Sequence, residues 1–330
     1  FWLQLLHDFC NEFTLPDARP NDCANVIWSI ALAQPHFAGK DKKIFRKHIL
    51  RILGQMQQSM KLMDGRSLGI VLWAFSNANY QDLEEMRVEY MGQTQTNVDN
   101  NPLSAWFNGG KHSVMQRLSE LIEAQQYTVH SNTLVLADDI IVILQSCTFK
   151  HKASGQRGLD MFGIPHHMLK ILSSRLLVRQ LDSVQSFTKP NLNYDQVLSL
   201  LQSLHQLDLY DDTLFTQLRV HLNHVLKYSS NEKWSHNEIL KCYALALKYC
   251  HLHNSLPLML QRIILWNKVH NMTEHHLSLL LKLLLQHKAL INFCDGNHDK
   301  VLRVVQYLQF FTQSAIASKK QQHNNVAVVS

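Results

Sequence analysis

One apolar pattern with a helical period recurs six times along this 330-residue chain, and it constrains the fold more than any other feature. In the first copy Cys23, Val26, Ile27 and Ile30 stand at i, i+3, i+4 and i+7, which share one face of an α-helix. The same template recurs five more times, starting at Leu68, Ile140, Val197, Ile239 and Leu277. We call the six starting residues the anchors and the helices that they predict the first helices.

The spacing of the anchors indicates a helical repeat. They are 45, 72, 57, 42 and 38 residues apart, and the two longest spacings contain polar, Gly-containing segments at 92–112 and 150–165, which we interpret as insertions. Without them the unit is about forty residues, and a second helical pattern follows each anchor, as in a helical hairpin. We therefore predict an all-α fold: a right-handed α-solenoid of about six helix-turn-helix repeats in a single array over 1–330, with a flexible tail at 312–330.

Two tryptophans occupy one position of this repeat, five residues after the anchor. They are Trp28 and Trp73, and small residues such as Ala24 and Gly69 lie close to them in sequence. Because a helix inside a solenoid buries a second face against the next repeat, we interpret both indoles as packing residues. The alternative is a pair of platforms for base stacking. The four later repeats carry Gln145, Gln202, Ala244 and Lys282 at this position.

Charge is distributed unevenly along the chain. Residues 1–165 hold 15 Lys/Arg and 16 Asp/Glu, a net charge of −1, whereas residues 166–330 hold 17 and 10, a net charge of +7. This excess permits an anionic partner. Helical spacing predicts basic faces that contact RNA phosphates, although each alone also fits a solvated surface. Their residues are Lys43, Lys47 and Arg51; Lys170, Arg175 and Arg179; and Lys241 and Lys248.

Motifs that would carry catalysis or hold a cofactor are missing from the sequence. We find no GxxxxGK[ST], GxGxxG, HExxH or GxSxG, and therefore predict no enzymatic activity and no cofactor. The pair His221 and His224 and the segment 250–253 (CHLH) lack the two spaced ligand pairs of a zinc site, so we expect no metal. The six cysteines form no CxxC pair, which suits a reducing compartment. No apolar run reaches the ~18 residues that would span a membrane.

Two segments, DCANVIWSIALAQ (22–34) and LMDGRSLGIVLWAFSNANY (62–80), carry a family resemblance. They resemble the first helix of octotricopeptide and heptatricopeptide repeats, which also occur in FAST-kinase-like proteins and in many proteins with a RAP domain. The matching residues are Asp22, Ala24, Asn25 and Trp28 in the first segment, and Leu68, Trp73, Ala74, Phe75 and Ser76 in the second. Beyond residue 80 the chain keeps only the period.

The resemblance implies a function that the period alone does not. Such proteins are mostly mitochondrial or chloroplast factors that bind RNA in transcript maturation or translation, and some relatives are subunits of organellar ribosomes. We therefore expect a mitochondrial protein, or one of another organelle, that binds RNA. As a mitochondrial ribosome subunit it would bind rRNA beside the neighbouring proteins of the ribonucleoprotein. The alternative is a HEAT-like protein-binding scaffold subunit of a larger complex.

Overall fold

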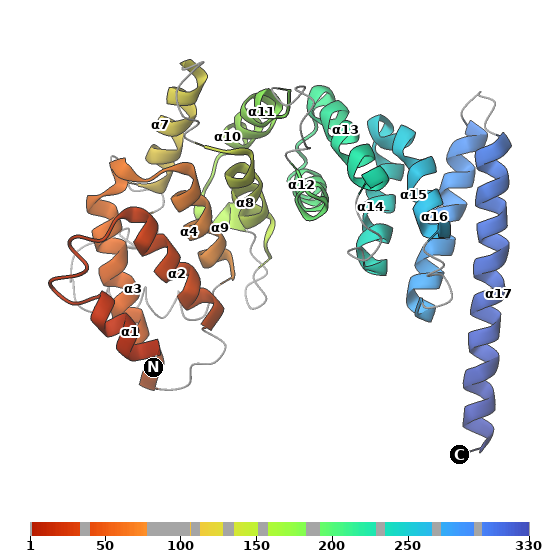
Figure 1. Ribbon diagram of the computed structural model, residues 1–330, viewed down its shortest axis with the longest axis horizontal. Coiled ribbons are helices and arrows are strands. Elements are labelled where there is room, and N and C mark those ends of the chain that lie inside the picture. Colours follow the sequence, from red (N-terminus) through yellow and green to blue (C-terminus); the bar gives the residue numbers. More distant parts are fainter. Residues whose placement is uncertain are drawn as a thin grey trace. The chain divides into compact units, whose positions relative to one another are not determined.

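The protein is helical throughout the part of the chain that the computed structural model describes (Figure 1). The described residues are 2–33, 40–77, 106, 113–127, 135–150, 158–182, 192–228, 235–265, 272–293 and 299–329. Within them no β-strand occurs. The predicted all-α class is thereby confirmed.

All six predicted first helices are present, and each begins three residues before its anchor. They are α2 (Pro20–Ala33), α4 (Gly65–Asn77), α8 (Ala137–Thr148), α12 (Tyr194–Gln206), α14 (His236–Lys248) and α16 (Glu274–Phe293). The anchor itself is buried in every one of them. The apolar pattern therefore predicts the presence of all six helices.

Capping side chains explain this common start. The residue four positions before the anchor is the N-cap, and in four helices its side chain accepts a hydrogen bond from the backbone N–H three residues on. These N-caps are Asp64, Asn193, Ser235 and Thr273. In α2 and α8 the bond runs the other way, because Asp22 and Asp139 accept from the N-cap N–H of Arg19 and Leu136. Every first helix therefore has a side chain that satisfies one of its terminal backbone groups.

A second helical segment follows each first helix, as predicted. Five are single helices: α3 (Lys40–Gln58), α7 (Val114–Tyr127), α13 (Asp212–Tyr228), α15 (Leu256–Leu265) and α17 (Asp299–Val329). In the third repeat the segment consists of α10 (His166–Ile171), a π-helical stretch η3 (Leu172–Leu177) and α11 (Val178–Asp182). Four short elements complete the description: α1 (Trp2–Phe9), η2 (Met60–Leu62), α9 (Gly158–Phe162) and η5 (Cys250–Ser255).

A recurring hydrogen bond joins the second helix of a repeat to the turn before its own first helix. In each case a side chain on the second helix donates to a backbone carbonyl in that turn. The bonds are Gln55 Nε2 to Pro16 O at 2.9 Å, Arg117 Nε to Met63 O at 2.8 Å, and Gln180 Nε2 to Val135 O at 2.7 Å. We call these three bonds the carbonyl clamps. Each clamp joins a second helix to the start of its own first helix.

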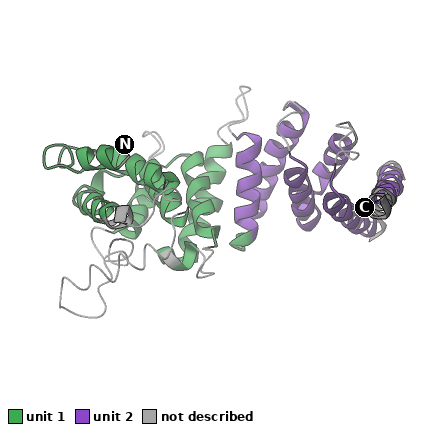
Figure 2. Cartoon of the chain, turned by 90° about the horizontal axis from the view of Figure 1, so that it is seen from below, with its two compact units in different colours: residues 1–183, 206–209 green, residues 184–205, 210–330 purple. Residues whose placement is uncertain are grey.

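The chain divides into two compact units, shown in different colours in Figure 2. Unit 1 comprises residues 1–183 and 206–209, and unit 2 comprises residues 184–205 and 210–330. In unit 1, α2 packs on α4 and α4 packs on α8, and in unit 2, α14 packs on α16. A Cβ atom at Gly69 would lie 3.5 Å from both the Val142 side chain and the Asp139 carbonyl of α8, so glycine suits this close approach of α4 and α8. These three pairs of successive first helices thus pack together within their units, and a single array of six repeats stays a prediction.

Parts of the predicted insertions and of the predicted tail belong to the helical core. Most of 92–112 lies outside the described residues, but Trp106 is buried, with its ring centroid 6.1 Å from that of Phe75. Segment 151–157 also lies outside them, whereas Phe162 of α9 is buried. The segment 312–329, which we predicted as a flexible tail, continues α17, and Thr312 is fully buried. Gly and Asn are frequent in 92–112 and Gly in 150–165, yet Trp106 and Phe162 within them are buried.

Candidate nucleic-acid interface

Each first helix presents one row of residues that are exposed or half-buried. The row consists of the positions two before the anchor and two, five and nine after it, and none of these positions is buried in any of the six helices. By contrast, the anchor and the residue seven after it are buried in all six. Intervals of three and four residues place the row on one helix face. We call it the outer row.

In unit 1 the outer row is rich in amide and aromatic side chains. From α2 to α8 it consists of Asn21, Asn25, Trp28 and Leu32; Arg66, Ile70, Trp73 and Asn77; and Asp138, Val142, Gln145 and Phe149. Amides offer both donors and acceptors, and indoles offer flat apolar faces. These are the groups with which proteins contact bases.

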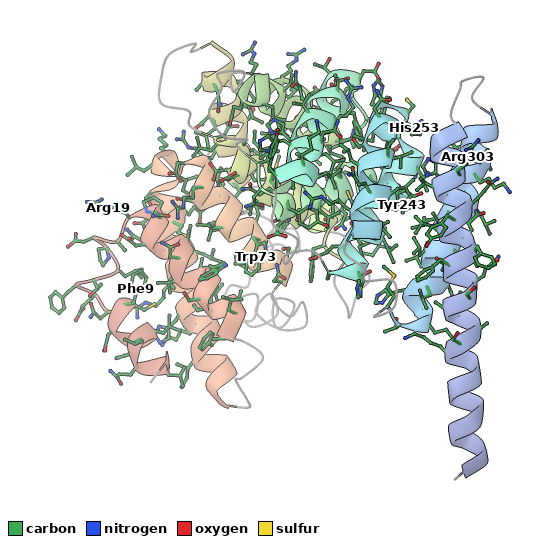
Figure 3. All side chains as sticks on the ribbon, turned by 45° about the vertical axis from the view of Figure 1, so that its right-hand side comes forward. Phe9, Arg19, Trp73, Tyr243, His253 and Arg303 are labelled. Carbon is green, nitrogen blue, oxygen red and sulfur yellow. The ribbon has the colours of Figure 1, made fainter. Side chains whose placement is uncertain are left out.

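The two tryptophans of this row contact each other across α2 and α4. Their ring centroids lie 6.2 Å apart and the rings are tilted by 43°. Trp28 is 42% exposed and Trp73, labelled in Figure 3, is half-buried. The rings contact each other while Trp28 also keeps an exposed surface, so the interpretation of both as packing residues stays a prediction. Five residues rotate a helix position by about 140° from the anchor, so this position faces away from the core.

In unit 2 the outer row becomes cationic. It consists of Asn237, Lys241, Ala244 and Lys248 on α14, of His275, Leu279, Lys282 and Gln286 on α16, and on α12 it includes Asp195, Ser199 and Gln202. The rows of α14 and α16 contain no carboxylate, and all three of their lysines are exposed. Because α14 packs on α16, these lysines belong to neighbouring parts of one surface.

A shallow groove follows the boundary between α14 and α16. It has a volume of about 580 Å³ and is lined by Ala244, Leu247, Lys248, Gln286, Ala289 and Leu290. The Nζ atom of Lys248 lies 3.4 Å from Nδ1 of His205, which itself lies 2.8 Å from the Tyr249 hydroxyl. The Lys248 ammonium group thus contacts α12, while Lys248 and Gln286 both line the groove.

The other predicted basic residues lie on second helices. Lys47 and Arg51 are exposed on α3, and the side chain of Lys43 is outside the described part of the structure. The remaining set is exposed over the segment from α10 to α11: Lys170, Arg175 and Arg179. The structure therefore joins Lys241 and Lys248 with Lys282, which our sequence-based set omitted. The signal for Lys282 is its place five residues after an anchor, the position of the tryptophans.

Histidine and cysteine side chains take part in local contacts. Among the described residues no group of three His, Cys, Asp or Glu is placed to hold a metal ion. Nε2 of His251 lies 2.9 Å from the Asp212 carboxylate, and Nε2 of His253 lies 3.3 Å from the Leu247 carbonyl. Burial raises the pKa of the Cys147 and Cys242 thiols to about 12, so both stay protonated at neutral pH.

Comparisons with family models, with curated proteins and with solved structures find no match to this chain. The resemblance over 22–34 and 62–80 therefore rests on the residues of the sequence. Of the described helices, none combines the length and the apolar character that crossing a membrane requires.

Proposed function

We propose that the protein binds single-stranded RNA along the outer rows of its first helices. The observation that carries this proposal is the row on α14 and α16, where three exposed lysines occur without a carboxylate. Among the described residues none of these lysines forms an ion pair with a carboxylate. Ammonium groups in this setting bind phosphates by charge.

The composition of the rest of the row supports RNA over other polyanions. Amide side chains, including Asn25, Gln145 and Gln202, occur along the first helices of both units. Phosphate contacts position a nucleic acid, whereas amides and aromatic rings contact its bases. Unpaired RNA offers both its phosphates and its bases to such side chains.

The cellular setting of this function follows from the family resemblance alone. Segments 22–34 and 62–80 support a role in transcript maturation or translation in mitochondria or another organelle. Within that setting, a ribosomal subunit bound to rRNA and a separate RNA-binding factor would use the same surface.

The proposal predicts an affinity that falls steeply with salt. Affinity for a fluorescent single-stranded RNA is measured between 50 and 300 mM salt for the wild type and for the triple variant Lys241→Gln, Lys248→Gln, Lys282→Gln. Each phosphate contact contributes roughly −0.7 to the log–log slope, so the variant flattens the slope by about 2. Lys and Gln have similar helix propensities, so the fold is retained and circular dichroism verifies it.

A matched control removes the same charge from a second helix. In the variant Lys170→Gln, Arg175→Gln, Arg179→Gln the salt slope stays close to that of the wild type, because these residues are not in the outer row. A third variant, Lys43→Gln, Lys47→Gln, Arg51→Gln, tests α3 in the same way. If all three variants flatten the salt slope equally, the RNA is bound by the overall positive charge and has no defined site.

One observation favours the alternative of a protein-binding scaffold. On α17 the side chains of Tyr307 and Phe310 are 61% and 71% exposed, and such apolar groups are typical of protein contacts. If the wild type shows no salt-dependent binding to RNA, the scaffold is the better interpretation. The double variant Tyr307→Ser, Phe310→Ser should then weaken the binding of the protein partner and leave the first helices unaltered.

A further inference from the structure

We propose that Trp28 and Trp73 form a stacking site for one unpaired nucleobase. This inference rests on the proposed binding of RNA and adds the chemical group that unit 1 recognises. It assigns different tasks to the two units, because the rows of α14 and α16 contact phosphates whereas those of α2 and α4 contact a base.

The fold itself does not require an indole at this position. The same position is Gln145 in α8, Gln202 in α12 and Lys282 in α16, and each of these helices begins at the same distance from its anchor as α2 does. A polar side chain is therefore compatible with a first helix here. The Trp28 side chain is 42% exposed, so its indole leaves apolar surface in contact with water. A polar residue at this position would avoid that cost.

The geometry of the two rings suits a planar ligand. A tilt of 43° at a centroid distance of 6.2 Å means that the indoles do not cover each other face to face. A base that stacks on the exposed face of Trp28 therefore has the ring of Trp73 as a second boundary. Stacking on aromatic rings is accessible to every base, because each base has a π-face.

Polar residues of the same row surround the pair and fit a base better than an apolar peptide side chain. Asn25 lies one turn before Trp28, and Asn77 lies one turn after Trp73. The Asn77 Nδ2 group donates to the Trp73 carbonyl at 2.9 Å, and among the described residues nothing donates to the Asn77 Oδ1 atom, which can accept from a ligand. Arg66, exposed two turns before Trp73, supplies a cation for the adjoining phosphate.

The test compares an RNA oligonucleotide with an abasic strand of equal length, which keeps the phosphates and lacks the bases. Trp28→Gln introduces the residue of α8 and α12 and should fold, as the urea midpoint verifies. We expect about a five- to hundredfold loss of affinity for RNA, as stacking on one aromatic ring predicts, with an unchanged salt slope. The abasic strand should bind wild type and variant alike.

The matched control is Leu32→Gln, because Leu32 is one turn further along the row of α2 and is 50% exposed. It removes a comparable apolar group that has no π-face, so affinity for RNA should stay at the wild-type value. Trp28→Phe keeps an aromatic ring and should retain most of the affinity.

The outcomes separate this inference from the proposed function. If the wild type binds RNA with a steep salt slope and Trp28→Gln binds it equally well, the proposed stacking site is wrong and the proposed RNA binding is retained. An equal loss on the abasic strand, or an equal loss in Leu32→Gln, also overturns stacking. If the wild type binds no RNA, both proposals fail together.

Discussion

His48 on α3 is a buried side chain whose charge state is set by its neighbours. It is 5% exposed, and its ring meets that of His7 at a centroid distance of 5.8 Å. Its Nδ1 atom has no hydrogen-bond partner among the described residues. Burial, and then the charges of His7, Arg51 and Lys47, lower the pKa of His48. The folded protein therefore favours a neutral imidazole at this position.

This lowered pKa predicts a loss of stability in acid. The unfolded chain binds a proton at His48 near pH 6.5 and the folded chain only below that value, so the free energy of unfolding falls as the pH drops from about 6.5 through the folded pKa. Urea unfolding at pH 7.5 and pH 5.0 measures this effect. Between the two pH values the free energy of unfolding should fall more for the wild type than for His48→Leu. His221 also has a pKa lowered by burial, so part of the loss remains.

Exposed histidine provides the control for this prediction. His167 is exposed on α10, and His167→Gln should show the same loss between the two pH values as the wild type. If His48→Leu loses as much free energy of unfolding between the two pH values as the wild type does, other groups cause the loss.

At the scale of a helix, the N-cap side chain marks where a first helix begins. In α14 the Ser235 hydroxyl accepts from the Glu238 N–H at 3.3 Å, while the Glu238 carboxylate accepts from the Ser235 N–H at 2.8 Å. Ser235→Ala removes the first bond and should lower the free energy of unfolding by about 1 kcal/mol. Urea unfolding measures this difference.

A serine inside a first helix distinguishes capping from a general effect of serine. Ser278 is exposed in the interior of α16, where alanine has the higher helix propensity, so Ser278→Ala should leave stability unchanged or raise it slightly. If both substitutions lower stability equally, the shared start of the helices has another cause than the cap.

The sequence predicts well those features that depend on local spacing. The anchors mark the six first helices because burial of one face requires an apolar residue at each turn. The outer row was harder to recognise, because Trp28 is apolar yet exposed and Lys282 lies between two runs of three leucines. Trp106 was missed for a related reason: one aromatic residue in a polar segment gives no period, although its burial contributes to the core.

At the scale of the molecule, a repeat period does not mark where compact units divide. One of the boundaries lies between residues 183 and 184, within a spacing of 57 residues between the anchors Ile140 and Val197. The period reports how each hairpin folds, because it depends on neighbours along the chain. The division depends on packing among several elements, which no single stretch of sequence encodes.

The carbonyl clamp between Arg117 and Met63 implies that the second hairpin is held by its side chains as well as by its covalent connection. Besides the clamp, α7 packs on α4 and α8 packs on α4. Two polypeptides, 1–92 and 93–330, expressed together should therefore reassemble and co-purify. Arg117→Met keeps an unbranched side chain without the donor and should weaken the reassembled pair about tenfold, since a hydrogen bond to a charged group contributes about 1.5 kcal/mol.

Arg66→Met is the control for this reassembly, because Arg66 is exposed in the outer row of α4. Fragments that fail to associate, or that associate equally tightly with Arg117→Met, would contradict the prediction. If the fragments reassemble, the peptide bond between residues 92 and 93 is not needed to hold α4 and α7 together. A gene can be split or permuted there, or another domain inserted, while the hairpin keeps its two helices together.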